Sequence, residues 1–215
     1  MVAARLAGDI AEPGRAMPRF WIVAGPNGSG KSTLVESGIV GPLLGANLVL
    51  LNADVLTREI LDADPAVKDA NLRAAVEIDD RVAAFIEQGV DFLVETVLSS
   101  DKYIDDIDRA LSLGFEVGLI YVCLQTPAAS IRRVASRTEM GGHDVPEDRI
   151  VARWGRSIEM LGRIAPKMHL LYVFDNSRRY EPVLLVSKQA GKLVFHAPGR
   201  IPEIDAVLSG PEGTG

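Results

Sequence analysis

The chain reads FWIVAGPNGSGKST over residues 20–33, and this stretch decides the fold class. The apolar run at 20–24 predicts a buried strand, and a helical pattern follows at 31–36. Between them lies the complete pattern G-x-x-x-x-G-K-[S/T], which in this strand-to-helix context predicts a phosphate-binding loop. The residues expected to bind nucleotide are Gly25, Pro26, Asn27, Gly28, Ser29, Gly30, Lys31, Ser32 and Thr33.

Each residue type in this loop suits a triphosphate. Glycines let the backbone approach phosphate groups closely, and the N–H groups at the start of the following helix then face the anion. We expect Lys31 to bring positive charge to the terminal phosphates and the hydroxyl of Ser32 to bind Mg²⁺. Thr33 is more typical of a helix residue than of a ligand. The loop therefore predicts ATP and Mg²⁺ as cofactors.

Motifs of two other classes of P-loop protein are missing from the sequence. A GTPase would need the guanine-reading motif N-K-x-D, and a transporter-type ATPase would need L-S-G-G-Q and a strand ending in Asp-Glu. The chain is also short for the transporter class, at 215 residues. These absences favour a compact kinase-like fold.

The length, composition and charge of the chain exclude several classes of protein. At about 150 residues per domain the length predicts one domain, and 47% apolar with 24% charged residues excludes a disordered or fibrous chain. The net charge of −6 disfavours broad binding to nucleic acids or membranes. No apolar run approaches the ~18 residues of a membrane span, and residues 1–18 lack the apolar core of a secretory signal, so we expect a cytoplasmic protein. The single cysteine, Cys123, lies in an apolar run and is predicted to be buried.

Strand and helix patterns alternate along the middle of the chain, which predicts an α/β fold with a parallel sheet covered by helices on both faces. We expect five strands, a C-terminal β-hairpin and a closing helix at 202–208, hence the three-layer fold of P-loop NTPases. Residues 1–18 are predicted to be a flexible leader, 19–208 a single domain and 209–215 a disordered tail. The five strands are expected at 20–24, 47–51, 91–94, 115–124 and 170–174, the hairpin strands at 183–186 and 192–195, and the other helices at 31–36, 55–62, 66–88, 104–113, 127–137 and 146–164.

Acidic residues follow two of the predicted strands, where parallel sheets bind their ligands. Asp54 is our candidate for the base that orients an acceptor hydroxyl and takes its proton. Capping of the next helix is the alternative, and Asn52 or Asp54 could do it. Glu95 ends an apolar strand, where an acid is costly without a partner. It is expected to bind Mg²⁺ or the acceptor, or else to pair with a cation, and Thr96 beside it could contact either ligand.

Arginines concentrate near residues 132–163 of this acidic chain, which we interpret as a helical lid over the nucleotide. Guanidinium groups suit the oxygens of a phosphoryl group in transfer, and a closed lid excludes water. The alternative is a solvated basic face paired with nearby acids. The connector between the two lid helices contains His143, for which a capping or hinge role is favoured over a chemical one. Any of the arginines in this stretch could reach the phosphates; they are Arg132, Arg133, Arg137, Arg149, Arg153, Arg156 and Arg163.

Taken together, these motifs resemble those of the zeta-toxin-like P-loop kinases, in the bacterial branch labelled predicted ABC-type ATPases. The resemblance covers roughly residues 17–190. The matching pieces after the phosphate loop are Asn52-Ala53-Asp54, Glu95-Thr96-Val97-Leu98-Ser99, Gly141-Gly142-His143-Asp144-Val145-Pro146, Arg153 with Arg156-Ser157, and Phe174-Asp175-Asn176-Ser177.

The resemblance implies an ATP-dependent kinase of a small hydroxylated acceptor. In zeta toxins the acceptor is a UDP-activated N-acetylhexosamine, and an antitoxin protein restrains the enzyme. By motif, Asp54 matches the family's catalytic base and Glu95 its strand-end acid. The resemblance also selects four arginines, which match the family's basic positions around the lid and are therefore expected to reach the phosphates: Arg133, Arg137, Arg153 and Arg156. This chain departs from the family on the acceptor side: Val97 replaces a second threonine, and an arginine expected near Ser99 is absent.

Two other functions remain open from sequence. One is an ATP-binding regulatory or interaction module without acceptor turnover, in which replacing Asp54 would change nothing. The other is an end-processing kinase for RNA or DNA, which would need a long basic groove and a steep salt dependence of binding.

Overall fold

The computed structural model describes residues 17–45, 48–139, 145–178 and 181–209, and the account below is confined to them. The predicted leader and tail therefore lie almost entirely outside the described residues. The same holds for His143 and for most of the lid connector, residues 140–144.

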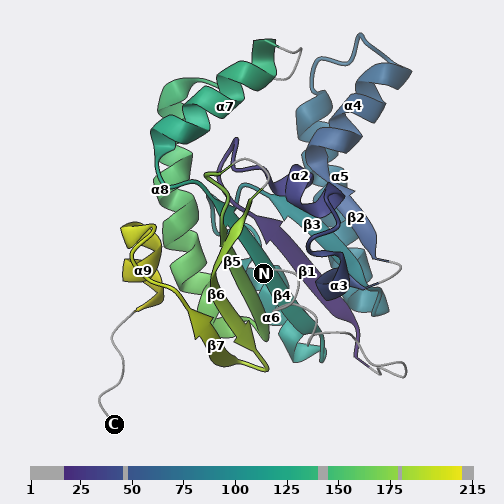
Figure 1. Cartoon of the computed structure of the whole chain (residues 1–215). Coiled ribbons are helices and arrows are strands. Elements are labelled where there is room, and N and C mark those ends of the chain that lie inside the picture. The colour runs from purple at the N-terminus through teal and green to yellow at the C-terminus, as the bar shows by residue number, and fades with distance from the viewer. Residues whose placement is uncertain (1–16, 46–47, 140–144, 179–180, 210–215) are drawn as a thin grey trace.

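A single mixed sheet organises the chain (Figure 1). Its order is β2-β3-β1-β4-β5-β6-β7, in which the first five strands run parallel and the last two antiparallel. The predicted hairpin is present, but it extends the parallel sheet, so the sheet has seven strands. The strands are β1 (Arg19–Ala24), β2 (Val49–Asn52), β3 (Phe92–Thr96), β4 (Glu116–Cys123), β5 (Leu170–Asp175), β6 (Val183–Gln189) and β7 (Lys192–His196).

Helices cover both faces of the sheet, as predicted. Two short elements were not anticipated from the sequence, α3 and η2, because four and three residues are too few to show a helical period. The helices are α2 (Lys31–Glu36), α3 (Gly41–Leu44), α4 (Ala53–Ala63), α5 (Ala70–Gln88), α6 (Ile104–Ser112), α7 (Pro127–Glu139), α8 (Glu147–Ile164), η2 (Ala165–Lys167) and α9 (Pro202–Leu208). None of them is long and apolar enough to cross a membrane.

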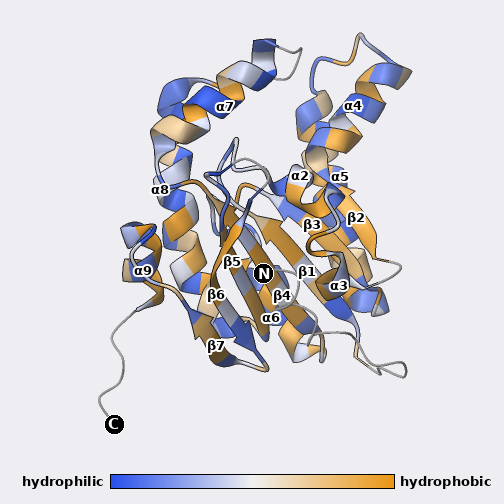
Figure 2. Cartoon of the chain, in the orientation of Figure 1, coloured by the Kyte–Doolittle hydropathy of each residue, from blue (hydrophilic) through white to orange (hydrophobic). Residues whose placement is uncertain are grey.

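The central strand β1 is buried along its whole length. Its alternate side chains enter two hydrophobic clusters: Ile22 faces helices α5, α6, α8 and α9, whereas Trp21 and Val23 face α2 and α3. Burial on both faces explains why β1 reads as a continuous apolar run. Figure 2 shows that the strands are mainly hydrophobic, whereas the helices combine hydrophobic and hydrophilic residues.

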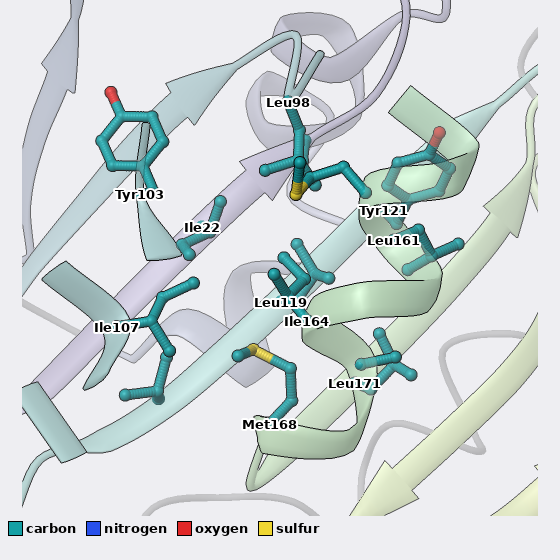
Figure 3. Close-up of a cluster of buried hydrophobic side chains, with 14 of the residues drawn as sticks. Ile22, Leu98, Tyr103, Ile107, Leu119, Tyr121, Leu161, Ile164, Met168 and Leu171 are labelled. Atoms are coloured by element: carbon teal, nitrogen blue, oxygen red, sulfur yellow. The ribbon is translucent and has the colours of Figure 1, made fainter. Parts of the chain in front are cut away.

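Figure 3 shows the larger cluster, where Ile22 and Leu119 of the sheet meet Ile107 of α6 and Leu161 of α8. Within this layer Cys123 is fully buried, as predicted, and burial raises the pKa of its thiol to about 12. At neutral pH the thiol is therefore protonated and unreactive.

One glycine allows two central strands to pack. Gly118 of β4 pairs with Trp21 of β1, and a Cβ at Gly118 would lie 2.5 Å from ring carbons of Trp21. We expect Gly118→Ala to lower the free energy of unfolding by about 1–3 kcal/mol, because the added methyl overpacks a closed core. Urea denaturation, followed by tryptophan fluorescence, measures this.

Gly155→Ala in α8 is the matched control, because a Cβ added at Gly155 would meet nothing within 4 Å. A helical Gly→Ala change there should be neutral or stabilise by about 0.5–1 kcal/mol. Equal unfolding midpoints for the two variants would show that the Trp21 ring yields to a methyl group.

Candidate active site

The phosphate loop, residues 25–33, runs from the end of β1 into α2. It lies where the chain changes direction in the sheet, with β2 and β3 on one side of β1 and β4 and β5 on the other. Gly25 and Gly30 have φ values of +145° and +92°, which L side chains rarely adopt. A Cβ at Gly25 would lie 1.9 Å from the Val122 carbonyl oxygen, and one at Gly30 would lie 2.4 Å from Asn176 Nδ2. The loop is therefore held closely by its neighbours.

Lys31 folds back over this loop. Its Nζ donates hydrogen bonds to the carbonyl oxygens of Gly25, at 2.9 Å, and Pro26, at 3.3 Å. Burial lowers the pKa of Lys31, while the charges of Glu95 and Asp54 raise it and that of Arg137 lowers it. These three charges act on Lys31 from β3, α4 and α7, so the structure brings together groups that the sequence separates by up to 106 residues.

Glu95 connects two sides of this site. Ser32 Oγ donates to Glu95 Oε1 at 2.8 Å, and Asn52 Nδ2 donates to Glu95 Oε2 at 3.0 Å. The charge of Glu95 also acts on Lys31, so the alternative of pairing with a cation applies beside these hydrogen bonds. A hydroxyl oxygen beside a carboxylate, next to the loop that would hold phosphates, is the hard oxygen donor set that Mg²⁺ prefers. Ser32 and Glu95 therefore fit Mg²⁺.

Asn52 caps helix α4. Its Oδ1 accepts hydrogen bonds from the backbone N–H groups of Asp54, at 2.8 Å, and Val55, at 3.2 Å. The capping role weighed for Asp54 thus belongs to Asn52, and the side chain of Asp54 lies exposed in the first helical turn. Because Asn52 also binds Glu95, one amide ties the helix that carries Asp54 to the strand that carries Glu95.

Thr96 has a local contact in this structure. Its Oγ1 accepts a hydrogen bond from the Leu98 backbone N–H at 3.2 Å, in a turn where Leu98 has a φ of +55°. The hydroxyl thus supports the turn after β3. Its proposed contact with acceptor or metal stays a prediction.

The predicted lid arginines have different surroundings. Figure 1 shows α7 and α4 projecting from the same end of the sheet, on opposite sides of the β1 end. Arg153 Nη1 donates to Asn27 Oδ1 at 3.3 Å, and the charge of Arg137 reaches Lys31. Arg133 Nη2 donates to the Asn176 carbonyl oxygen at 2.6 Å. Arg156 is exposed on α8, and no hydrogen bond joins it to the phosphate loop in the described part of the chain.

Asn176 is a site residue to which sequence reasoning gave no role. It is 8% exposed, and its Nδ2 donates to the Ser29 carbonyl oxygen at 2.8 Å. Its position was a usable signal, because Asn176 follows β5 directly, as Asp54 follows β2, at the edge where parallel strands end.

Comparison with known proteins identifies a family for this chain. The family model for zeta toxin matches residues 4–182. An uncharacterized protein of Haemophilus influenzae (strain ATCC 51907 / DSM 11121 / KW20 / Rd) is 28% identical over 131 residues, which span 60% of this chain and 88% of that protein.

Solved structures resemble the chain at low identity. The complex AvrRxo1-ORF1:AvrRxo1-ORF2 with sulphate ions has a TM-score of 0.65 at 16% identity, over 100% of this chain and 70% of that one. The same pair with ATP has a TM-score of 0.61 at 15% identity, with the same coverage. The PezAT toxin-antitoxin system of Streptococcus pneumoniae has a TM-score of 0.57 at 17% identity, over 84% of this chain and 78% of that one.

At these identities the solved structures show a shared fold, and the family match carries the relationship. It covers most of the chain, including the phosphate loop, α4 and both arginine-bearing helices. The chain therefore belongs to the zeta toxin family of P-loop kinases.

Proposed function

We propose that this protein transfers the γ-phosphoryl group of ATP to a hydroxyl of a small acceptor. The observation that carries the proposal is the convergence of Asp54, Glu95 and Arg137 on Lys31, with Asn52 taking the capping role of Asp54. A binding module needs the phosphate loop, but it does not need an exposed carboxylate held beside that loop. A structure of the similar AvrRxo1-ORF1:-ORF2 complex was solved with ATP, which supports ATP as the donor.

In this proposal Lys31 acts on the phosphate donor and Asp54 acts on the acceptor. Lys31, released from the Gly25 and Pro26 carbonyl oxygens, binds the β- and γ-phosphates, and backbone N–H groups of the loop bind their oxygens. Asp54 orients the acceptor hydroxyl and takes its proton as the acceptor oxygen bonds to the γ-phosphorus. The bond to the bridging oxygen breaks, and ADP leaves with that electron pair. Bound Mg²⁺, held by Ser32 and Glu95, would offset negative charge on the phosphates.

We further propose that residues 132–163 close as a lid within a single domain spanning 19–208. Three of the arginines already lie near the phosphate loop. The charge of Arg137 acts on Lys31, Arg153 donates to Asn27, and Arg133 Nη1 lies 3.6 Å from the position that a Cβ at Gly30 would take. Arg156 would reach a γ-phosphate only on closure. Arg133 contacts the loop after β5, so its expected part is to hold that loop and, on closure, to reach the phosphates.

UDP-N-acetylglucosamine or a related sugar nucleotide is the acceptor that family membership favours. The resemblance of the fold to a toxin-antitoxin system favours a small antitoxin partner. A mass-spectrometric test incubates the protein with ATP, Mg²⁺ and UDP-sugars, nucleosides, small hydroxylated metabolites and 5′-hydroxyl oligonucleotides. The expected result is a one-phosphate mass gain on a small acceptor, lost in Lys31→Ala. Turnover of the oligonucleotides alone would favour the end-processing kinase, and no mass gain on any acceptor would refute phosphotransfer to these classes.

The lowered pKa of Lys31 predicts an alkaline limit to ATP use, meaning a pH above which kcat/KM for ATP falls. Only the protonated ammonium attracts phosphates, so kcat/KM for ATP should fall as the pH rises through the Lys31 pKa, below the range of an ordinary lysine. Arg137 lowers that pKa, so Arg137→Ala should move the limit to higher pH. Glu95 raises it, so Glu95→Gln should move the limit to lower pH.

Profiles of kcat/KM against pH test both shifts. Arg163→Ala, which removes an exposed cation from the last turn of α8, is the control and should keep the wild-type limit. If all variants share one alkaline limit, Lys31 is not the group that sets it.

A further inference from the structure

The chain continues past the region that matches the family model. Strands β6 and β7 and helix α9 lie after residue 182, where the match ends. In Figure 1 they lie on the β5 side of the sheet, away from β2. β6 pairs with β5, so this C-terminal extension is built onto a strand whose end borders the phosphate loop.

Arg200, which lies between β7 and α9 in this C-terminal extension, contacts the end of β5. Arg200 Nε donates to Asp175 Oδ2 at 3.0 Å, and Gln125 Nε2 donates to the same oxygen at 2.9 Å. The Ser177 backbone N–H donates to Asp175 Oδ1 at 2.9 Å. Asp175 is 1% exposed, so its carboxylate depends on these donors for solvation. Burial raises the pKa of Asp175, but the hydrogen bonds from Ser177, Arg200 and Gln125 outweigh it and hold the pKa below the usual range.

The segment that carries Arg200 is itself anchored. Asp205 of α9 accepts a hydrogen bond from the Gly199 backbone N–H at 2.7 Å and lies 3.2 Å from His196 Nε2. The Ala197 backbone N–H donates to the Leu185 carbonyl oxygen of β6 at 2.7 Å. The segment that positions the Arg200 guanidinium is therefore itself held in place by hydrogen bonds.

The residue after Asp175 joins three parts of the site. The Asn176 backbone N–H donates to the Cys123 carbonyl oxygen at the end of β4, at 2.9 Å. Its side chain holds the Ser29 carbonyl oxygen at 2.8 Å, and its own carbonyl oxygen accepts from Arg133 of α7 at 2.6 Å. The shape of the loop at 175–177 therefore sets where the phosphate loop and α7 lie relative to each other.

We propose that Arg200 is a positioning residue for nucleotide binding: it holds Asp175, so that Asn176 fixes the phosphate loop at Ser29 and anchors Arg133. Arg200 itself does not touch nucleotide. The C-terminal extension is thus a working part of the nucleotide site, and this inference rests on the proposed use of ATP.

The test measures ATP affinity in the presence of Mg²⁺ by titration calorimetry, with kcat and KM where an acceptor is known. Asn176→Ala leaves the buried Ser29 carbonyl oxygen without its donor and should weaken ATP binding about tenfold. Arg200→Ala should weaken it about three- to tenfold, mainly in KM, because the loop binds ATP in ground and transition states alike. Arg200→Gln can still donate to Asp175 and should recover most of the affinity, even if Arg200→Ala folds poorly. Lys192→Ala, an exposed cation of β7, should match the wild type.

The results separate the two proposals. If the wild type binds ATP and Lys31→Ala does not, while Arg200→Ala and Asn176→Ala bind within twofold of the wild type, the positioning role is wrong and the proposed function stands. If Arg200→Ala lowers the melting temperature without lowering ATP affinity, Arg200 is structural only, which also overturns the proposal. If the wild type does not bind ATP, both proposals fail.

Discussion

Replacing Lys31 with alanine is expected to lower kcat/KM for ATP-dependent phosphotransfer at least about a hundredfold, a loss typical of removing one charge-stabilising donor from a preorganised site. The physical reason is that the Lys31 side chain is half-buried, where the attraction of its ammonium for phosphate is stronger than at a fully exposed position. Acceptor phosphorylation by mass spectrometry and ATP binding by calorimetry provide the two measurements.

Lys31→Arg is not expected to rescue this loss. Lys31 Nζ donates to the loop carbonyl oxygens of Gly25 and Pro26, and this arrangement suits a compact ammonium better than a planar guanidinium. Lys68→Ala removes an exposed lysine between α4 and α5 and should leave turnover unchanged. Normal turnover by folded Lys31→Ala protein would contradict the role of this loop in catalysis.

The order of strands and helices could be predicted because each strand alternates with a helix of recognisable period. Trp154 and Leu161 illustrate this, since they lie seven residues apart, two helical turns, and are both buried in α8. The sheet order was not predictable in the same way. Nothing local in Val183–Gln189 says that it will extend the parallel sheet, because that depends on pairing with β5, and β5 is placed in the sheet by its own pairing with β4, about 50 residues earlier.

In the candidate site, too, local features could be predicted from the sequence and long-range contacts could not. The phosphate loop could be predicted because eight consecutive residues carry it, and Asp54 because it lies within three residues of the end of a predicted strand. The contacts of Asn176 with Ser29 and of Arg200 with Asp175 span 147 and 25 residues. Residues 174–177 match a family motif, but the motif does not show which distant residues they contact. A single amide that caps a helix and binds Glu95, as Asn52 does, is likewise visible only once the strands are side by side.

Replacing Asp54 with asparagine is expected to lower kcat by about 10²- to 10⁴-fold, the usual contribution of a general base, with little change in ATP affinity. Asparagine keeps the size of the side chain and its place in the first turn of α4, but it cannot take the acceptor proton. Because Asn52 caps this helix, the change should leave helix stability nearly intact. Single-turnover phosphorylation of the acceptor, alongside ATP titration and thermal unfolding, separates chemistry from binding and folding.

Asp62→Asn is the matched control, because it makes the same chemical change on the same helix, at an exposed position near the opposite end. It should retain full kcat. Asp54 also raises the pKa of Lys31, so Asp54→Asn should move the alkaline limit of ATP use to lower pH, and kcat must be compared below that limit. If Asp54→Asn then turns over acceptor as fast as Asp62→Asn, the carboxylate is not the base, and the acceptor proton leaves to solvent or to the phosphate itself. If both variants bind ATP and neither they nor the wild type phosphorylate any acceptor, the chain acts as the nucleotide-binding module instead.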